Sequence, residues 1–323
     1  MLNHAFIKFN YPLKSTKEIS RNEGRWLFII REPSSTSDRI SMRLKGVFGS
    51  HHSYKVSEYP GHSILLAEEA VYESFQYVIA VGGDGTIHEV INGLYAGSKN
   101  KGIEAPALAI LPVGTGNDFA RTIGITNSLN ALQDRLARGE TQLIDLGKCS
   151  YMNCTGQIES RCFINVMDVG IGGSIAARVA RYRRGFWAKL AYQRALLREL
   201  PFYKRATITC KMNGNKQELE VLSLVIANGK WFGKGIGISP YSSINDGILN
   251  GVIFGRVGII EYILHLPSLV RCKRVIHPEV SYHEMREVSV DSTHALPVEL
   301  DGEFLGYTPS SISVVPQAIR LVI

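Results

Sequence analysis

A strand that leads into a glycine-rich turn and then into a helix is the feature that most constrains this sequence. The stretch "VIAVGGDGTIHEVINGL", residues 78–94, opens with β-branched apolar residues, which indicate a buried strand. Apolar side chains then recur at helical spacing, at Ile87, Val90, Ile91 and Leu94. Because a buried strand followed at once by a helix is the repeating unit of parallel α/β sheets, we expect such a sheet here.

The turn itself carries polar chemistry. It contains Gly82, Gly83, Asp84, Gly85 and Thr86. Glycines permit positive φ and a close approach of backbone N–H groups to a ligand, and the N-terminus of the following helix favours negative charge. Glycines alone would fit a tight turn equally well, but an aspartate among them at the end of a parallel strand favours a ligand site. No Gly-Lys-Ser/Thr follows, so this is not a Walker A loop.

Strand and helix patterns alternate along the first part of the chain. Strands are expected at 26–30, 54–56, 75–81 and 108–111, and helices at 38–48, 63–74, 87–94 and from a cap at Ser128 to Gly139. This alternation predicts a doubly wound parallel α/β domain over residues 1–145. From about residue 163 short β-rich runs separated by Gly, Asn and Asp predict a second, mainly antiparallel domain over 146–308, and residues 309–323 could return to the first domain.

Charge and cysteine content indicate the kinds of partner and the compartment that suit this chain, but they do not identify its function. The chain of 323 residues has 36 Lys and Arg against 29 Asp and Glu, a net charge of +7, which favours acidic partners such as nucleotide phosphates, nucleic acid or an anionic membrane. Five cysteines without metal-like spacing indicate a reducing compartment. No signal-peptide pattern is seen and the apolar runs are too short to span a bilayer, so we expect a cytoplasmic protein.

A second glycine-rich turn follows the next strand, in "ILPVGTGNDFAR". Successive parallel strands would bring this turn beside the first. Thr115 could donate to a phosphate or ribose, whereas Asn117 and Asp118 could cap the next helix or hold the loop.

With "GGDGTIHEV" and "LPVGTGNDFAR" in this order, the chain resembles the diacylglycerol kinase catalytic family, which includes sphingosine kinases and bacterial soluble lipid kinases. The resemblance runs from about Arg25 to the C-terminus, and "LIDLG", "SINDGIL" and "VELDGEFLG" agree with it. It implies an N-terminal α/β domain, a C-terminal β-sandwich domain and an ATP site in the cleft between them.

The resemblance also implies roles for particular residues. Glu303 corresponds to the catalytic base, with Asp84 and Asp301 beside it in the catalytic set. Asp246, with the carbonyls of Ser243 and Ile248, resembles a structural Mg²⁺ site. The implied cofactor-binding residues are Ser57, Gly82, Gly83, Asp84, Gly85, Thr86, Glu89, Gly114, Thr115, Asn117 and Asp118.

One loop departs from the family pattern. The family usually has Asn-Pro-x-Ser/Ala-Gly after the first strand, whereas this chain has "REPSSTSDR", with Arg31 and Glu32 at the position of the Asn. Nucleotide affinity and nucleotide choice are therefore open at this loop.

We expect an ATP- and Mg²⁺-dependent lipid kinase that phosphorylates a hydroxyl of diacylglycerol or a related lipid. Asp84 cannot lie against a phosphate bare, because like charges repel, so Mg²⁺ or a proton must come between them. Two alternatives stay open: an enzyme similar to NAD kinase, which shares the Gly-Gly-Asp-Gly-Thr loop, and a non-catalytic lipid-binding regulatory protein with an altered nucleotide loop.

A basic stretch, "RVARYRRGFWAKLAYQRALLREL", bears on whether the protein associates with a membrane that contains its lipid substrate. It carries seven Lys and Arg from Arg178 to Arg198 and a single acid, Glu199, together with aromatic residues. Such a helix could lie on an anionic bilayer, or it could be an ordinary solvated basic face. We expect peripheral membrane association and no binding of nucleic acid, since no recognition motif accompanies the charge. A homodimer is left open.

Overall fold

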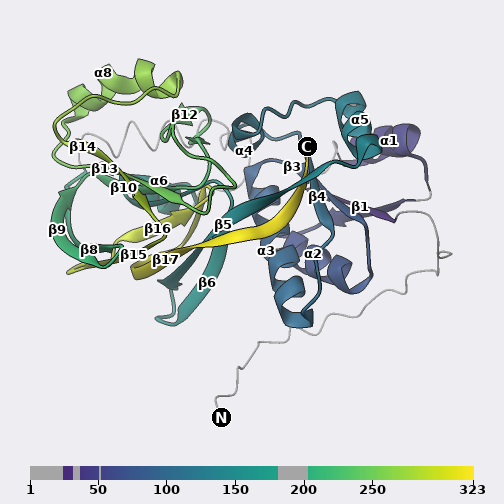
Figure 1. Ribbon diagram of the computed structural model, residues 1–323, viewed down its shortest axis with the longest axis horizontal. Helices are drawn as coiled ribbons and strands as arrows, with labels where there is room; N and C mark the ends of the chain where they lie inside the picture. The colour runs from purple at the N-terminus through teal and green to yellow at the C-terminus, as the bar shows by residue number, and fades with distance from the viewer. Residues whose placement is uncertain (1–24, 32–36, 51, 181–202) are drawn as a thin grey trace, which may run out of the picture.

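The computed structural model describes residues 25–31, 37–50, 52–180 and 203–323 (Figure 1). Its N-terminal half contains four parallel strands in the order β4-β3-β1-β2. They are β1 (Trp26–Arg31), β2 (Ser53–Ser57), β3 (Tyr77–Gly82) and β4 (Ala107–Pro112). The helices of this half are α1 (Ser37–Phe48), α2 (His62–Tyr72), α3 (Asp84–Lys101), α4 (Asp118–Thr122) and α5 (Leu129–Arg138).

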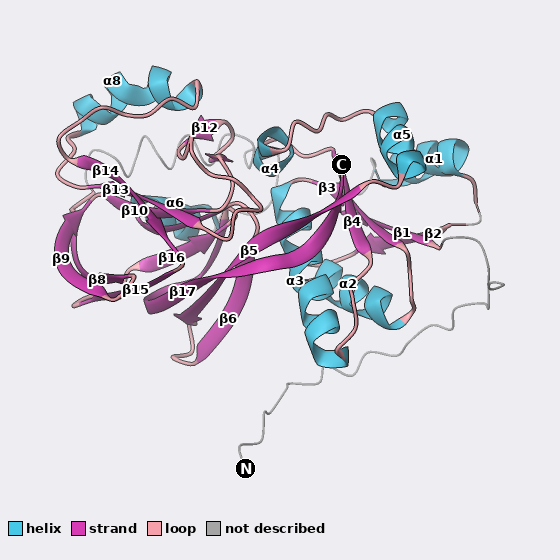
Figure 2. Cartoon of the chain, viewed as in Figure 1, coloured by secondary structure: helices cyan, strands magenta, loops and turns pink. Residues whose placement is uncertain are grey.

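Both faces of this sheet are covered, which explains why its strands are apolar throughout. Leu27 and Ile29 of β1 pack into a core shared with α2 and α3, whereas Phe28 and Ile30 pack into a core shared with α1 and α5. Figure 2 shows the two helix pairs on opposite sides of the strands. The predicted doubly wound parallel α/β fold is confirmed.

The C-terminal half is a sandwich of two antiparallel layers. One layer has the strand order β14-β13-β10-β7-β16, and the other contains β8, β9 and β15. A buried core between the layers draws on both, for example Val169 and Leu224 from the first and Ile208 and Val288 from the second. The bounds of these strands are β7 (Val166–Gly170), β8 (Ala206–Met212), β9 (Asn215–Val221), β10 (Ser223–Ala227), β13 (Leu249–Phe254), β14 (Val280–Met285), β15 (Glu287–Ser292) and β16 (Pro297–Leu300). The predicted β-sandwich is confirmed.

Smaller elements complete this half. Strand β6 (Ile158–Phe163) lies at the edge of the sheet beside β5 (Thr141–Met152), and a short hairpin is made by β11 (Trp231–Phe232) and β12 (Ile236–Gly237). Helix α6 (Ile171–Ala180) follows β7, and helix α8 (Ile259–Val270) follows β13.

Two long strands run through both halves of the molecule. Strand β5 (Thr141–Met152) pairs antiparallel with β17 (Glu303–Val322), and the far end of β17 lies parallel to β4, with Leu321 opposite Leu108. Figure 1 shows this pair crossing from the sandwich to the α/β sheet. Among the described residues, all strands except β11 and β12 therefore belong to one continuous sheet. The predicted domain boundary after residue 145 falls inside β5.

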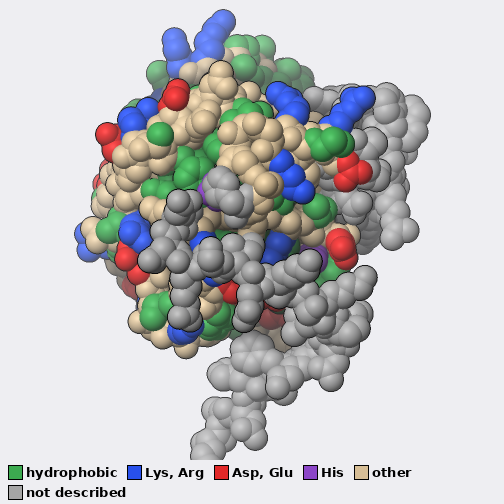
Figure 3. Space-filling view, turned by 90° about the vertical axis from the view of Figure 1, so that its right-hand side faces the viewer, with side chains coloured by type: hydrophobic (Ala, Val, Ile, Leu, Met, Phe, Trp, Pro, Cys, Tyr) green, Lys and Arg blue, Asp and Glu red, His purple; other side chains and the backbone are tan. Residues whose placement is uncertain are grey.

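Several predictions fall outside the described residues. They include most of the basic stretch and the helix expected within it, because residues 181–202 are not described, and the "REPSS" loop beyond Arg31. On the face of the molecule seen in Figure 3, Lys and Arg side chains are scattered among acidic ones. Within the described ranges, no helix is long and apolar enough to cross a membrane.

Candidate active site

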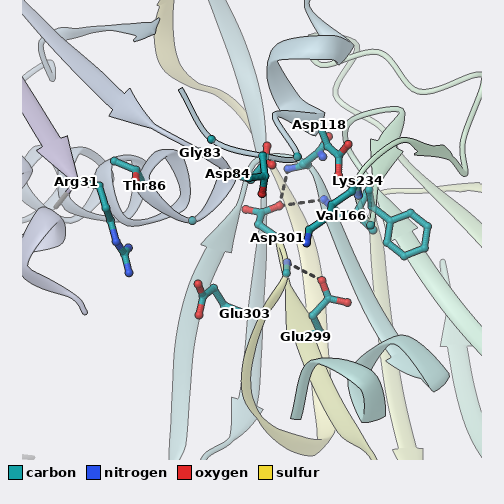
Figure 4. A pocket seen from close by; sticks show the side chains of 18 residues that line it. Arg31, Gly83, Asp84, Thr86, Asp118, Val166, Lys234, Glu299, Asp301 and Glu303 are labelled. Atoms are coloured by element: carbon teal, nitrogen blue, oxygen red, sulfur yellow. Dashed lines mark hydrogen bonds between the residues drawn. The ribbon is translucent and has the colours of Figure 1, made fainter. Parts of the chain in front are cut away.

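A cavity of about 370 Å³ lies where the two halves meet. Its walls come from the turns after β3 and β4, from the β11–β12 hairpin and from the turn between β16 and β17. Nine of the predicted site residues line it: Gly83, Asp84, Gly85, Thr86, Gly114, Thr115, Asp118, Asp301 and Glu303. Figure 4 shows carboxylates and cations from both halves around this space.

The two glycine turns pack directly against each other. A Cβ atom on Gly114 would lie 2.4 Å from the Cα atom of Gly83, and one on Gly82 would lie 2.1 Å from Oγ1 of Thr86. The backbone N–H of Val113 also donates to the carbonyl of Gly82 at 2.9 Å. Gly114 is thus required for the contact between the loops, and Gly82 for close packing within the first loop. The contact between the loops holds both backbones at the cavity wall.

Helix α3 presents its N-terminus to the cavity. The helix is 18 residues long, and its N-cap residue, Gly83, has no side chain to accept from the first N–H groups. Unpartnered N–H groups and the helix dipole at such an end favour an anion. This wall is therefore suited to phosphate oxygens.

Asp84 and Asp118 form a crowded acidic pair beside that helix end. Oδ1 of Asp84 accepts from the backbone N–H of Phe119 at 3.1 Å, which ties α3 to α4. Burial raises the pKa of Asp84, with a smaller contribution from nearby Asp301. Burial and the charge of Asp84 also raise the pKa of Asp118 to about 6. Two carboxylates this close favour a cation between or beside them.

Asp301 holds the turn that carries Glu303. Its oxygens accept backbone N–H groups from Ile164, Asn165 and Val166 at 2.9 to 3.0 Å. Nδ1 of His88, in α3, lies 2.9 Å from Oδ2 of Asp301, and both side chains are buried. With these four contacts Asp301 has a positioning role, and the pair with His88 links the two halves of the chain.

Glu303 lies at the cavity, two residues after Asp301, at the start of β17. Its Oε1 lies 3.0 Å from the position that a Cβ atom on Gly85 would take, close to the first turn of α3. Behind it, Oε1 of buried Glu299 accepts from the N–H of Gly302 at 2.6 Å. Burial raises the pKa of Glu299 well above its usual range, and the carboxylates of Asp168, Asp301 and Glu303 add to this shift. Glu299 therefore braces the turn through its bond to Gly302, and its burial favours the protonated form of its side chain.

Two cationic side chains that were not predicted as ligands, Arg31 and Lys234, also line the cavity. Nη1 of Arg31 bonds to Oε1 of Glu89 at 3.0 Å, and Glu89 also accepts from the N–H groups of Gly61 and Ser63 at the start of α2. Glu89 thus positions Arg31 and caps α2, and it does not itself line the cavity.

Lys234 enters from the opposite wall, on the β11–β12 hairpin. Its backbone N–H donates to Oδ2 of Asp118 at 2.7 Å, and Figure 4 shows its side chain extending toward the cavity beside Asp301. Its φ of 69° lies in the left-handed region, where a non-glycine residue costs about 1 kcal/mol or more. Lys234 thus combines a left-handed backbone with a side chain that lines the cavity.

The remaining predicted cofactor residues lie behind the cavity wall. Ser57 is buried at the end of β2, and Gly82 is in β3. Nδ2 of Asn117 donates to the carbonyl of Gly114 at 2.9 Å and makes no cap bond to α4, so of its two expected roles it holds the loop. Nucleotide contacts by Ser57, Gly82, Glu89 and Asn117 stay predictions.

The predicted metal residues form a turn away from the cavity. Oδ1 of Asp246 accepts from the N–H of Ile248 at 3.0 Å, and Oγ of Ser243 donates to Oδ1 of Asn245 at 2.8 Å. The turn is fixed to the frame by buried Asp145, which accepts from the N–H of Gly247 at 2.7 Å. Whether Asp246, Ser243 and Ile248 hold Mg²⁺ stays a prediction.

Comparisons with known proteins agree with this architecture. Residues 27–149 match the diacylglycerol kinase catalytic domain, and residues 165–323 match the YegS C-terminal NAD kinase beta sandwich-like domain. A diacylglycerol kinase of Bacillus subtilis (strain 168) is 27% identical over 301 residues, which cover 91% of this chain and 95% of that protein. A diacylglycerol kinase of Staphylococcus aureus (strain bovine RF122 / ET3-1) is 26% identical over 88% of this chain and 87% of its own length.

Solved structures show the same fold. A crystal structure from Bacillus anthracis str. Sterne superposes with a TM-score of 0.72 at 19% sequence identity, covering 93% of this chain and 96% of the other. A second structure from that organism, described as a diacylglycerol kinase, gives a TM-score of 0.66 at 18% identity, with coverages of 93% and 96%.

Proposed function

This chain belongs to the diacylglycerol kinase catalytic family, and we propose that it is an ATP- and Mg²⁺-dependent lipid kinase acting on a hydroxyl of diacylglycerol or a related lipid. The observation that carries the proposal is that an anion site and a carboxylate able to act as a base line the same cavity. The glycine turns and the start of α3 offer an anion site, and Glu303 from the other half faces it. Phosphoryl transfer needs this combination of a held phosphate and an activated acceptor.

The donor side of the reaction relies on backbone groups and cations. We infer that the phosphates lie against the glycine turns and the N-terminus of α3, with Arg31 and Lys234 on either side. These cations would offset the negative charge that is spread over the transferring group. Asp84 and Asp118 would orient the phosphates through a metal ion.

The donor set fits Mg²⁺ that arrives with the nucleotide. Mg²⁺ in such enzymes is usually held by one or two carboxylates together with substrate phosphates, and Asp84 and Asp118 are such a pair. In the described part of the chain no group of three or more His, Cys, Asp or Glu side chains is arranged to hold a metal alone. When bound, the ion would screen the phosphate charge from the two carboxylates.

On the acceptor side, Glu303 would take the proton of the lipid hydroxyl. A hydroxyl is a poor nucleophile until its proton begins to leave, and a positioned base lowers that barrier. Asp301 and Glu299 would act through Glu303 by fixing the turn on which it sits. The enzyme would work as a cytoplasmic protein at the surface of a membrane that contains its lipid substrate.

A phosphorylation assay with radiolabelled ATP and Mg²⁺ tests the proposal. The acceptors are a mixed lipid extract, purified diacylglycerol and NAD, each offered to the wild type and to Glu303→Gln. Labelled lipid that depends on Glu303 supports the lipid kinase. Label in NAD would instead support the enzyme similar to NAD kinase, and no label in any acceptor would support a non-catalytic lipid-binding protein.

A further inference from the structure

Helix α8 exposes an apolar stripe at the outer edge of the C-terminal half. Its exposed side chains include Ile260 (75% exposed), Ile263 (48%), Leu264 (70%) and Val270 (57%). They follow helical spacing, so they share one face, while Tyr262 and Leu269 on the other face are buried in the sandwich. A surface helix with a buried apolar face normally has a polar outer one, and α8 is apolar on both.

Basic side chains border this stripe. Arg271, Lys273 and Arg274 follow the last turn of α8 and are exposed, and the same loop presents Ile276 at 86% exposure. The single acid within α8, Glu261, accepts from the N–H of Gly258 at 2.6 Å at the start of the helix, and its Oε1 lies 3.6 Å from Nε2 of His277 in the loop after α8. Exposed apolar side chains beside a cluster of cations match an interface of lipid tails and anionic headgroups.

The size of the stripe argues against a second copy of the chain as its partner. A helix of 12 residues is roughly 18 Å long and about 10 Å wide, so its outer face offers on the order of 200 Å². A stable dimer buries about 800 Å² on each partner. A bilayer, in contrast, requires only that a few apolar side chains enter it.

We propose that α8 and the loop after it are the docking surface for an anionic lipid bilayer. Ile260, Ile263 and Leu264 would enter the interface, and Arg271, Lys273 and Arg274 would meet the headgroups. This deepens the proposed function and rests on it for the identity of the lipid substrate, because a kinase for a membrane lipid must reach a bilayer. Figure 1 shows α8 on the sandwich half, at a distance from the helices of the α/β half.

Co-sedimentation with vesicles tests the proposal without any requirement for activity. One set of vesicles is phosphatidylcholine alone and the other is an equal mixture of phosphatidylcholine and phosphatidylglycerol. For Ile260→Asp/Leu264→Asp we expect a fall of about 10²-fold in the partition coefficient on mixed vesicles, roughly tenfold for each apolar side chain lost. Replacement of Arg271, Lys273 and Arg274 by Gln should weaken binding to mixed vesicles by about fivefold for each cation, and salt should weaken wild-type binding.

The matched control is Ile158→Asp. Ile158 is 64% exposed in β6, on a different edge of the molecule, so its replacement should leave vesicle binding and the melting temperature unchanged. Since every altered residue of α8 is exposed, those variants should also melt with the wild type, which excludes misfolding as the cause.

Two outcomes would overturn the docking surface. One is wild-type binding that the α8 variants do not reduce, and the other is a wild-type dimer in sedimentation velocity that dissociates in Ile260→Asp/Leu264→Asp. The docking surface and the kinase activity can fail separately. A protein that phosphorylates no lipid in detergent, yet binds vesicles through α8, would refute the proposed function and leave the docking surface standing.

Discussion

The contact between the glycine turns leads to a graded prediction. In Gly114→Ala the new Cβ atom would lie 2.4 Å from the Cα atom of Gly83, about 1 Å short of the 3.4 Å at which ordinary contact begins. The two Gly83 atoms nearby, Cα at 2.4 Å and N at 3.0 Å, are backbone, so the loops must separate by about that amount, and the side chain of Asn117, with Oδ1 at 2.9 Å, must move as well. A misplacement of about 1 Å in a phosphate-binding loop can lower turnover by roughly 10²-fold. In Gly83→Ala the corresponding distance is 3.1 Å, so a shift of a few tenths of an ångström suffices and we expect a loss of only about threefold to tenfold.

Turnover of lipid at saturating ATP measures the effect, and melting temperature reports on the fold. The control is Gly46→Ala in α1, where nothing lies within 4 Å of the new Cβ atom. That variant should keep full activity and gain up to about 1 kcal/mol of stability, because alanine favours a helix over glycine. Equal activity losses in Gly83→Ala and Gly114→Ala, or a Gly114→Ala enzyme within threefold of the wild type, would refute the reasoning.

Four further predictions concern single side chains. Glu303→Gln should lower lipid phosphorylation by about 10² to 10⁴-fold while ATP affinity by calorimetry stays near wild type, and a loss of ATP affinity alone would remove Glu303 as the base. Lys234→Gly relieves a left-handed residue, so its melting temperature should hold or rise while tripolyphosphate binds roughly tenfold more weakly; a matching loss of stability would indicate a structural role instead. The folded-state pKa of Glu299 is raised, so wild-type stability should fall as pH rises above about 4.5, and urea unfolding of Glu299→Gln should show a smaller fall; parallel curves would contradict this. Asp246→Ala should blunt the rise in melting temperature with added Mg²⁺, and an unchanged rise would mean that "SINDGIL" is only a turn.

Local signals predicted the α/β half well. Helix α5 begins after Ser128, whose Oγ accepts from the N–H of Ala131, and its C-cap is Gly139 in the left-handed conformation, as expected from the sequence. Helix α3 is longer than the predicted 87–94, because its first turn is the glycine loop itself and its last turns are polar. The parallel strands could be predicted because both of their faces are buried, which makes them continuous apolar runs in the sequence.

The long strand β17 could not be predicted from the sequence in the same way. Strand β17 contains Pro309 and Pro316, which normally end a strand. The structure accommodates both prolines at shifts in the register with β5, between Tyr307 and Ser311 and between Val315 and Ile319. A strand that continues through two irregularities has no continuous pattern for sequence analysis to detect.

The candidate site likewise contains local motifs, which the sequence predicts, and contacts between distant residues, which it does not. The glycine turns, with Asp84 and Asp118, were predictable because each motif is local. The contact of His88 with Asp301 joins residues 213 positions apart, and the bond of Arg31 to Glu89 joins residues 58 apart. Such pairs depend on the fold, so no spacing in the sequence indicates them.

The placement of β17 has a consequence for how the protein is made. Strand β4 ends at residue 112, yet the strand that covers its free edge is completed only at residue 322. At a synthesis rate of about 5 to 20 residues per second, that edge waits for roughly 10 to 40 s after β4 has emerged. An exposed strand edge can pair with other chains during this interval, so the nascent α/β half should be a target for chaperones. The α/β sheet is therefore completed only when β17 has been synthesised, long after its other strands.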